Sequence, residues 1–160
     1  MTGLLCGENS CLYAPWIQAH KRIVKAKRED WALTTWKVKH SELVKKTQAE
    51  HESAGWSMKV EDQNYWRLRG TSAVLTGKCD LVGHREHSGS FRVIDCKTGE
   101  PRAKDKIQVA IYCIALPLAW KRPTLQIHGA VVYPDHTIWI EPDQADTIRE
   151  KLFALIRQIG

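Results

Sequence analysis

The sequence predicts an α/β domain with a mixed central β-sheet flanked by helices. Apolar residues recur at helical spacing up to about residue 50, and from Trp56 onward apolar and polar residues alternate as they do in strands. A helical pattern then follows the strand pattern SFRVIDCK, as is typical of layered α/β folds. No repeat, low-complexity run or linker divides the 160 residues. We therefore predict one domain, 1–160, with a basic helical part at 1–50 and a sheet core with flanking helices at 55–160.

Two amphipathic helices are predicted in the basic part, from Tyr13 to about Arg28 and from about Asp30 to Ala49. Their predicted inward residues are Tyr13, Trp16, Ile17, Ile23 and Val24 in the first and Leu33, Trp36, Leu43 and Val44 in the second. Their basic residues are Lys21, Arg22, Lys25, Lys27, Arg28, Lys37, Lys39, Lys45 and Lys46. Such a face can follow nucleic-acid phosphates, although a solvated helix surface has the same composition.

Four strands are predicted next. WSMKVED and YWRLRG read as a hairpin joined at residues 62–64, SAVLTGKCDLVGHRE as one long third strand, and SFRVIDCK as the fourth. The turn before the fourth strand carries His84 and His87 at a spacing that metal ligands also use. A polar loop is the commoner origin of such residues, so we leave both outside the site.

The rest of the chain predicts a helix, two strands and a final helix. The helix Arg102 to Leu116 is expected to end at Pro117 and to face the sheet with Ile107, Ala110, Ile111 and Ile114. LQIHGAVVYP and HTIWIEP are the two strands. The final helix runs from about Asp143, its expected cap, to Ile159.

Charge and cysteine content limit the class of protein. A net charge of +6 and a pI near 9.1 suit a polyanionic partner. No apolar run is long enough to span a membrane, and the N-terminus lacks the features of a signal peptide. The five scattered cysteines are expected to be reduced thiols, with Cys79 and Cys96 in the core, and we therefore expect a cytoplasmic protein without membrane contact.

Seven tryptophans are many for this length, and their positions on apolar stripes predict that most lie in the core. One or two near the basic helices could stack on unpaired bases.

The segment Gly77 to Tyr112 carries the chemistry. Alternation along FRVIDCK places Asp95 and Lys97 on one face of a strand, with Cys96 on the other. Asp80 and Asp95, if strand pairing brings them together, offer hard oxygen ligands to Mg²⁺ or Mn²⁺, and Lys97 could orient a water or stabilise charge on a phosphate. An isolated Asp-x-Lys is usually solvent-facing charge, but here a core-like strand precedes it and a helix follows.

Three short motifs in this order resemble the RecB-like branch of the PD-(D/E)xK nuclease superfamily. They are Gly77-x-x-Asp80, Asp95-x-Lys97-Thr98-Gly99 and Gln108-x-x-x-Tyr112. The resemblance implies a restriction-endonuclease-like core. It also implies metal ligation by Asp80, Asp95 and the backbone carbonyl of Cys96, and catalysis by Asp80, Asp95 and Lys97.

The resemblance also implies that Gln108 and Tyr112 contact the nucleic acid, with Lys104 on the same helical stripe. A histidine from an upstream helix completes the metal site in such proteins. Family layout favours His40, although Trp36 stands where relatives often have glycine. His20 is the reserve candidate and Glu52 a distant third.

Among these relatives, the nucleases of CRISPR adaptation hold an iron-sulfur cluster with one N-terminal and three C-terminal cysteines. Cys11 resembles the first of these, but no cysteine follows Cys113. We therefore expect no cluster.

The sequence thus favours a metal-dependent deoxyribonuclease acting on single strands or DNA ends, in repair, recombination, phage biology or defence, with a helicase or similar protein as a possible partner. A restriction-type endonuclease that acts as a dimer is the nearest alternative. A DNA-binding module of a larger complex that has lost turnover, and a protein whose basic face meets an acidic partner, remain open.

Overall fold

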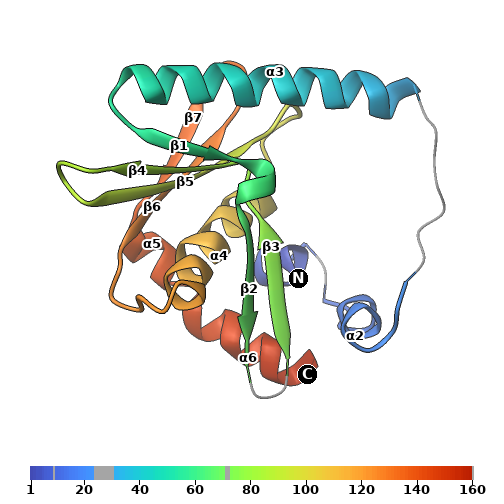
Figure 1. Cartoon of the computed structure of the whole chain (residues 1–160). Coiled ribbons are helices and arrows are strands. Elements are labelled where there is room, and N and C mark those ends of the chain that lie inside the picture. Colours follow the sequence, from blue (N-terminus) through green and yellow to red (C-terminus); the bar gives the residue numbers. More distant parts are fainter. Residues whose placement is uncertain (9, 24–30, 71–72, 160) are drawn as a thin grey trace.

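The structure is a computed structural model, which describes residues 1–8, 10–23, 31–70 and 73–159. It confirms the predicted mixed α/β class, with a central sheet between helices (Figure 1). No helix in the described ranges is long and apolar enough to cross a membrane. The predicted roles of Val24, Lys25, Lys27 and Arg28 fall outside the described residues.

The central sheet has five strands in the order β1-β4-β5-β6-β7. These are β1 (Ser57–Val60), β4 (Leu81–Arg85), β5 (Ser90–Cys96), β6 (Ile127–Val132) and β7 (Thr137–Ile140). Only the β5–β6 pair is parallel, and the three other pairs are antiparallel. A separate antiparallel pair is formed by β2 (Tyr65–Arg69) and β3 (Val74–Lys78).

One long helix lies on each face of the central sheet. Helix α3 (Trp31–Ser53) crosses one face, where Leu43 and Val44 pack on Leu81, Ile94 and other strand residues. Helix α4 (Ala103–Ala119) covers the opposite face and lies between the sheet and the C-terminal helices α5 (Pro142–Asp146) and α6 (Arg149–Ile159) (Figure 1). The short helices α1 (Thr2–Leu5) and α2 (Tyr13–His20) complete the described chain.

The face that α4 turns to the sheet differs from the prediction. Val109 and Cys113 contact the sheet at Gly129, where an added Cβ would lie 2.6 Å from Val109 Cγ1. Ile111 and Ile114 instead pack with Leu152 of α6, on the side of α4 away from the sheet. The apolar residues of α4 cover both sides because the helix is sandwiched, so periodicity alone could not choose between them.

The predicted hairpin between the first two strands is wrong. β1 pairs with β4, and a 3₁₀ turn, η1 (Glu61–Gln63), directs the chain away into the β2–β3 pair. Asn64 fixes this turn, because its side-chain amide donates to the carbonyls of Lys59 at 2.8 Å and Asp80 at 3.3 Å. The predicted long third strand is likewise broken into β3 and β4 at Cys79 and Asp80.

Several predicted helix ends also shift. Helix α2 ends at His20 and α3 continues to Ser53. Helix α4 passes Pro117 by two residues, because a proline in the last turn costs one backbone bond while Trp120 N–H still donates to Leu116 at 2.9 Å. The final helix is divided into α5 and α6, and its cap is Glu141 rather than Asp143.

The expectation that most tryptophans are buried is wrong. Trp56 and Trp66 are buried, whereas Trp16, Trp31, Trp36, Trp120 and Trp139 are among the exposed apolar residues. The predicted inward side chain of Trp36 is 48% exposed, and that of Leu33 is 40% exposed. Large amphipathic rings thus remain available at the surface.

Candidate active site

Strand β5 carries the Asp95 and Lys97 pair in the alternation expected of a strand. Lys97 Nζ lies 2.7 Å from Asp95 Oδ2, and the Asp95 side chain is almost fully buried. Cys96 points to the other face, into the cluster under α3, where its thiol lies 3.8 Å from Thr47 Oγ1. Burial raises the pKa of the Cys96 thiol to about 12, so only the backbone of this residue remains as a candidate ligand.

Asp80 lies where the chain leaves the β2–β3 pair and enters the central sheet. Its Oδ2 accepts a hydrogen bond of 2.7 Å from the backbone N–H of Cys96. Its backbone carbonyl accepts from the N–H of Glu61 at 2.8 Å and from the side chain of Asn64. The break between β3 and β4 thus fixes Asp80 against the end of β5.

His40 of α3 faces the same point. Its Nε2 lies 3.5 Å from Asp80 Oδ1 and 3.7 Å from Glu61 Oε1. One ligand atom from each of these three residues lies within 4.8 Å of the others, which is a geometry that can hold a metal ion. The His40 ring stacks on Trp36 with 5.1 Å between centroids.

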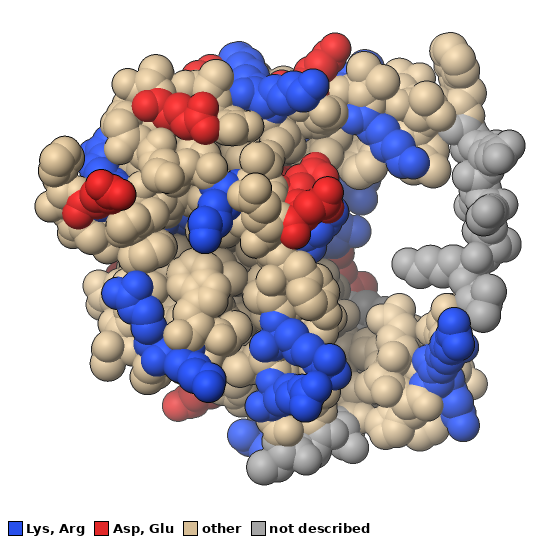
Figure 2. Space-filling model, viewed as in Figure 1, with Lys and Arg blue, Asp and Glu red and all other residues tan. Residues whose placement is uncertain are grey.

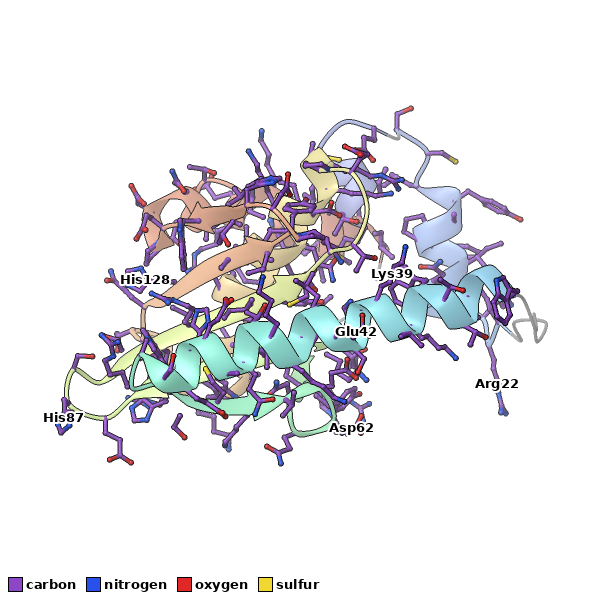
Figure 3. The ribbon with its side chains drawn as sticks, turned by 90° about the horizontal axis from the view of Figure 1, so that it is seen from above. Arg22, Lys39, Glu42, Asp62, His87 and His128 are labelled. Atoms are coloured by element: carbon purple, nitrogen blue, oxygen red, sulfur yellow. The ribbon has the colours of Figure 1, made fainter. Side chains whose placement is uncertain are left out.

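The other predicted ligands lie elsewhere. His20 is exposed on α2, stacks on Trp16 and contacts its backbone carbonyl. Glu52 is exposed near the end of α3 and accepts a hydrogen bond from Gln48. Figure 3 shows His87 at the tip of the β4–β5 hairpin, away from Asp62, the neighbour of Glu61.

Gln108 of α4 connects the charged groups. Its Nε2 donates to Asp95 Oδ1 at 3.1 Å, and its Oε1 accepts from Lys97 Nζ at 3.2 Å. The same Nε2 donates to Tyr112 Oη at 2.7 Å, and Tyr112 in turn donates to the carbonyl of Lys78 at 3.2 Å. Tyr112 is 7% exposed, so the structure places it beneath Gln108 rather than at a nucleic-acid surface.

These groups open onto one hollow of about 460 Å³ between α3 and α4. Its lining residues include Trp36, His40, Asp80, Asp95, Lys97 and Gln108, with Arg102 at the start of α4. Lys104 is not among the lining residues, so Arg102 is the cation that α4 presents there.

Burial shapes the electrostatics of the two carboxylates. Loss of water and the charge of Asp80 together raise the pKa of Asp95 to about 6, although Lys97 opposes the shift. Burial also raises the pKa of Asp80, against the Cys96 N–H bond and the nearby His40. A divalent cation bound between two buried carboxylates would relieve the repulsion between their charges.

A family model that describes the PD-(D/E)XK nuclease superfamily matches residues 9–159. The chain belongs to this superfamily. Members are generally nucleases, so the family implies a metal-dependent nuclease. No curated protein sequence matches the chain.

Solved structures also match the chain, less closely than the family model does. Eighteen chains of known structure match this member of the superfamily. The crystal structure of SSO0001 is one, with 14% identity and a TM-score of 0.42. The match covers 79% of this chain and 61% of that one.

The donor set of this site fits a divalent cation. Carboxylate oxygens are the ligands that Mg²⁺ and Mn²⁺ prefer, and one imidazole is compatible with Mn²⁺. Nδ1 of His40 is buried without a hydrogen-bond partner among the described residues, and Nε2 is the nitrogen that faces the carboxylates. His40, Glu61 and Asp80 are therefore the residues that could hold the ion, and Asp95 lines the same hollow with its oxygens against Lys97 and Gln108.

Glu61 is the residue that sequence reasoning missed. Its link to Asp80 depends on the pairing of Val60 with Leu81, which brings together residues separated by the whole β2–β3 pair. The spacing of residues along the sequence does not predict this contact. The sequence signal available was the alternation of SMKV, which places a carboxylate directly after a strand.

Proposed function

We propose that this protein is a deoxyribonuclease that uses Mg²⁺ or Mn²⁺ to hydrolyse phosphodiester bonds in single strands or at DNA ends. The observation that carries the proposal is the convergence of Asp80, Asp95 and Lys97 on one hollow with His40 and Glu61. The motif order supports the RecB-like branch of the superfamily. A helicase or another repair or defence protein would supply the opened strand.

In this proposal Asp80, Asp95, His40 and the backbone carbonyl of Cys96 hold the ion, and Glu61 joins them. When bound, the ion would polarise the scissile phosphate and lower the pKa of a water molecule. Hydrolysis adds the oxygen of that water to phosphorus, breaks one bond from phosphorus to an ester oxygen, and leaves a proton on the departing oxygen.

Lys97 is proposed as the catalytic cation. The Lys97 side chain is 28% exposed, and its Nζ donates to Gln108 Oε1 at 3.2 Å and lies 2.7 Å from Asp95 Oδ2, so two of the three N–H groups can be taken up by these contacts. The third can reach a phosphate oxygen or the attacking water in the hollow. Arg102, at the edge of the same hollow, can contact a flanking phosphate.

The test is cleavage of end-labelled single-stranded, linear duplex and closed circular DNA, with Mg²⁺, Mn²⁺ or chelator. Wild-type protein is compared with Asp95→Ala, Lys97→Ala and the control Lys151→Ala, which removes an exposed lysine of α6. We expect metal-dependent cutting of single strands or linear ends that both site variants lose and the control retains. Retained cleavage by both site variants would reject the proposal, and cutting of closed circles would favour a restriction-type endonuclease.

A further inference from the structure

A second hollow, of about 380 Å³, lies on the α4 side of the sheet beside the β2 strand. Volumes of this size are typical of small-molecule and cofactor sites. Val82 and Leu116 are the aliphatic residues that line it. We call it the aromatic groove, because its lining includes the ring residues Tyr65, Trp66, His84, Phe91 and Trp120.

The rings stand on two sides of the groove. β2 contributes Tyr65, which is 61% exposed, and the buried Trp66. On the other side the Phe91 ring contacts Trp120 with 5.6 Å between centroids and stacks on His84 at 4.4 Å. Exposed ring faces around a cleft are suited to stacking on an unpaired base, because every base has a π-face.

The charges around the groove are positive. Its lining includes Lys59 and Arg122 and no carboxylate. Both cations are exposed, and neither forms an ion pair within the described part of the chain. Arg122 lies over the Phe91 ring, 5.4 Å from its centroid. Cations beside aromatic rings suit a phosphate attached to a stacked base.

The basic surface continues beyond the groove. Alternation along β2 places Arg67 and Arg69 on the same exposed face as Tyr65. Figure 2 shows the face with the β2–β3 pair in front, where Lys and Arg lie in both halves and most Asp and Glu lie in the upper half. A strand that enters the groove would therefore find further phosphate contacts along the hairpin.

No listed residue lines both hollows, but contacts between side chains connect the groove to the candidate active site. Trp66 lines the groove and packs edge-on against Tyr112, whose hydroxyl accepts from Gln108. Asn64 also lines the groove while its amide holds the backbone of Asp80. Residues that line the groove thus contact residues that build the candidate active site.

We propose that the aromatic groove binds one unstacked nucleotide of a single-stranded nucleic acid, with the base against Tyr65 or Trp120 and its phosphate on Lys59 and Arg122. The inference deepens the proposed function, since it assigns a substrate class to the nuclease and a place where the strand is held next to the reaction. A duplex cannot offer this contact, because its bases are already stacked.

The test measures binding of a fluorescein-labelled single-stranded oligonucleotide by anisotropy in chelator, where no metal-dependent cleavage occurs. Tyr65→Ala is expected to weaken binding about five- to hundredfold, the usual effect of losing one stacked base. Lys59→Ala combined with Arg122→Ala should reduce the slope of log K against log salt by about 1.4, as expected for two lost phosphate contacts on a single strand.

Matched controls are Trp139→Ala and Lys151→Ala, an exposed aromatic and an exposed lysine on β7 and α6, which should bind as wild type. Unfolding curves of all variants check that each is folded. A strand carrying iodouracil should crosslink to peptides that contain Tyr65 or Trp120.

Unchanged affinity in both groove variants would overturn the inference, and cleavage of DNA by those same variants would show that the proposed nuclease function survives it. If the groove variants lose binding while the wild-type protein cleaves no DNA in Mn²⁺, the nuclease function would be rejected and the assignment of the groove would stand. A free mononucleotide that competes as tightly as the oligonucleotide would overturn the assignment to a strand.

Discussion

The side-chain nitrogen of Gln108 lies 2.7 Å from the hydroxyl oxygen of Tyr112, one helical turn further along α4. This contact turns the Gln108 amide so that its oxygen faces Lys97 and its nitrogen also reaches Asp95. The buried tyrosine thus fixes the orientation of two charged groups that it does not touch.

Gln108→Met should therefore lower kcat about 10- to 100-fold, as is usual when a group that orients a metal or catalytic residue is lost. KM should change little, because the ring surfaces that could hold substrate stay in place. Tyr112→Phe should give a smaller decrease of the same kind. Steady-state cleavage kinetics test this, with Gln126→Met, at an exposed loop position, as control. A rise in KM with kcat unchanged would contradict a positioning role.

His40→Gln should weaken Mn²⁺ binding about 10- to 100-fold, since it removes the imidazole that faces Asp80 and Glu61. His20→Gln should leave the affinity unchanged, because His20 lies on α2 against Trp16. Calorimetric titration of both proteins makes the comparison. Equal affinities in the two variants would remove His40 from the site.

Glu61→Gln should also weaken Mn²⁺ binding, by about tenfold, because the amide keeps the size of the side chain and loses its charge. Asp62→Asn is a close control, since Asp62 is the next residue, contacts the same Lys78, and has a side chain that is 98% exposed. Titration of both variants against wild type gives the answer. An equal loss in the two would indicate a diffuse charge effect rather than ligation.

Without metal, Asp95 should make the fold more stable as the pH falls. Its pKa is about 6 in the folded protein, against an ordinary value near 3.8, so between these values the folded state holds a proton that the unfolded state lacks. This contribution is full below about pH 4 and is lost as the pH rises through 6. It amounts to about 1 kcal/mol at pH 5 relative to pH 8.

Urea unfolding in chelator at the two pH values measures this effect as the difference between wild type and Asp95→Asn, which cannot titrate. Carboxylates outside the site contribute equally to both proteins and cancel, whereas Asp80, whose charge acts on Asp95, responds to the substitution as well. A difference that does not vary with pH, or that grows with rising pH, would contradict the burial of an ionised Asp95.

Gly77→Ala should destabilise the protein by about 1–3 kcal/mol, as expected when a methyl group is forced into a packed site. An added Cβ would lie 2.5 Å from Cζ2 of the Trp66 ring, so the ring would have to move. Gly99→Ala has no atom within 4 Å of the added Cβ and is the matched control. Denaturation followed by tryptophan fluorescence compares them, and equal stability of the two variants would show that Trp66 relaxes freely.

The sequence predicts the parts of the site that are close along the chain. Alternation places Asp95 and Lys97 together, and helical spacing places Tyr112 beneath Gln108. It could not predict that Glu61 meets Asp80, because that contact depends on β1 pairing with β4 across an excursion through β2 and β3. Nor could it show which tryptophans are exposed, since amphipathic rings occupy stripes of helices whether or not a partner covers them.

The chain leaves the central sheet at Glu61, forms the β2–β3 pair and returns to the sheet at Asp80. The two residues therefore lie side by side at the base of this pair. An ion bound by both residues would link the two ends of the β2–β3 segment. A nucleic acid that binds the β2–β3 pair and favours one arrangement of Glu61 and Asp80 would alter the affinity of the site for the ion. Thermodynamic linkage then requires that the ion alters the affinity for that nucleic acid by the same factor.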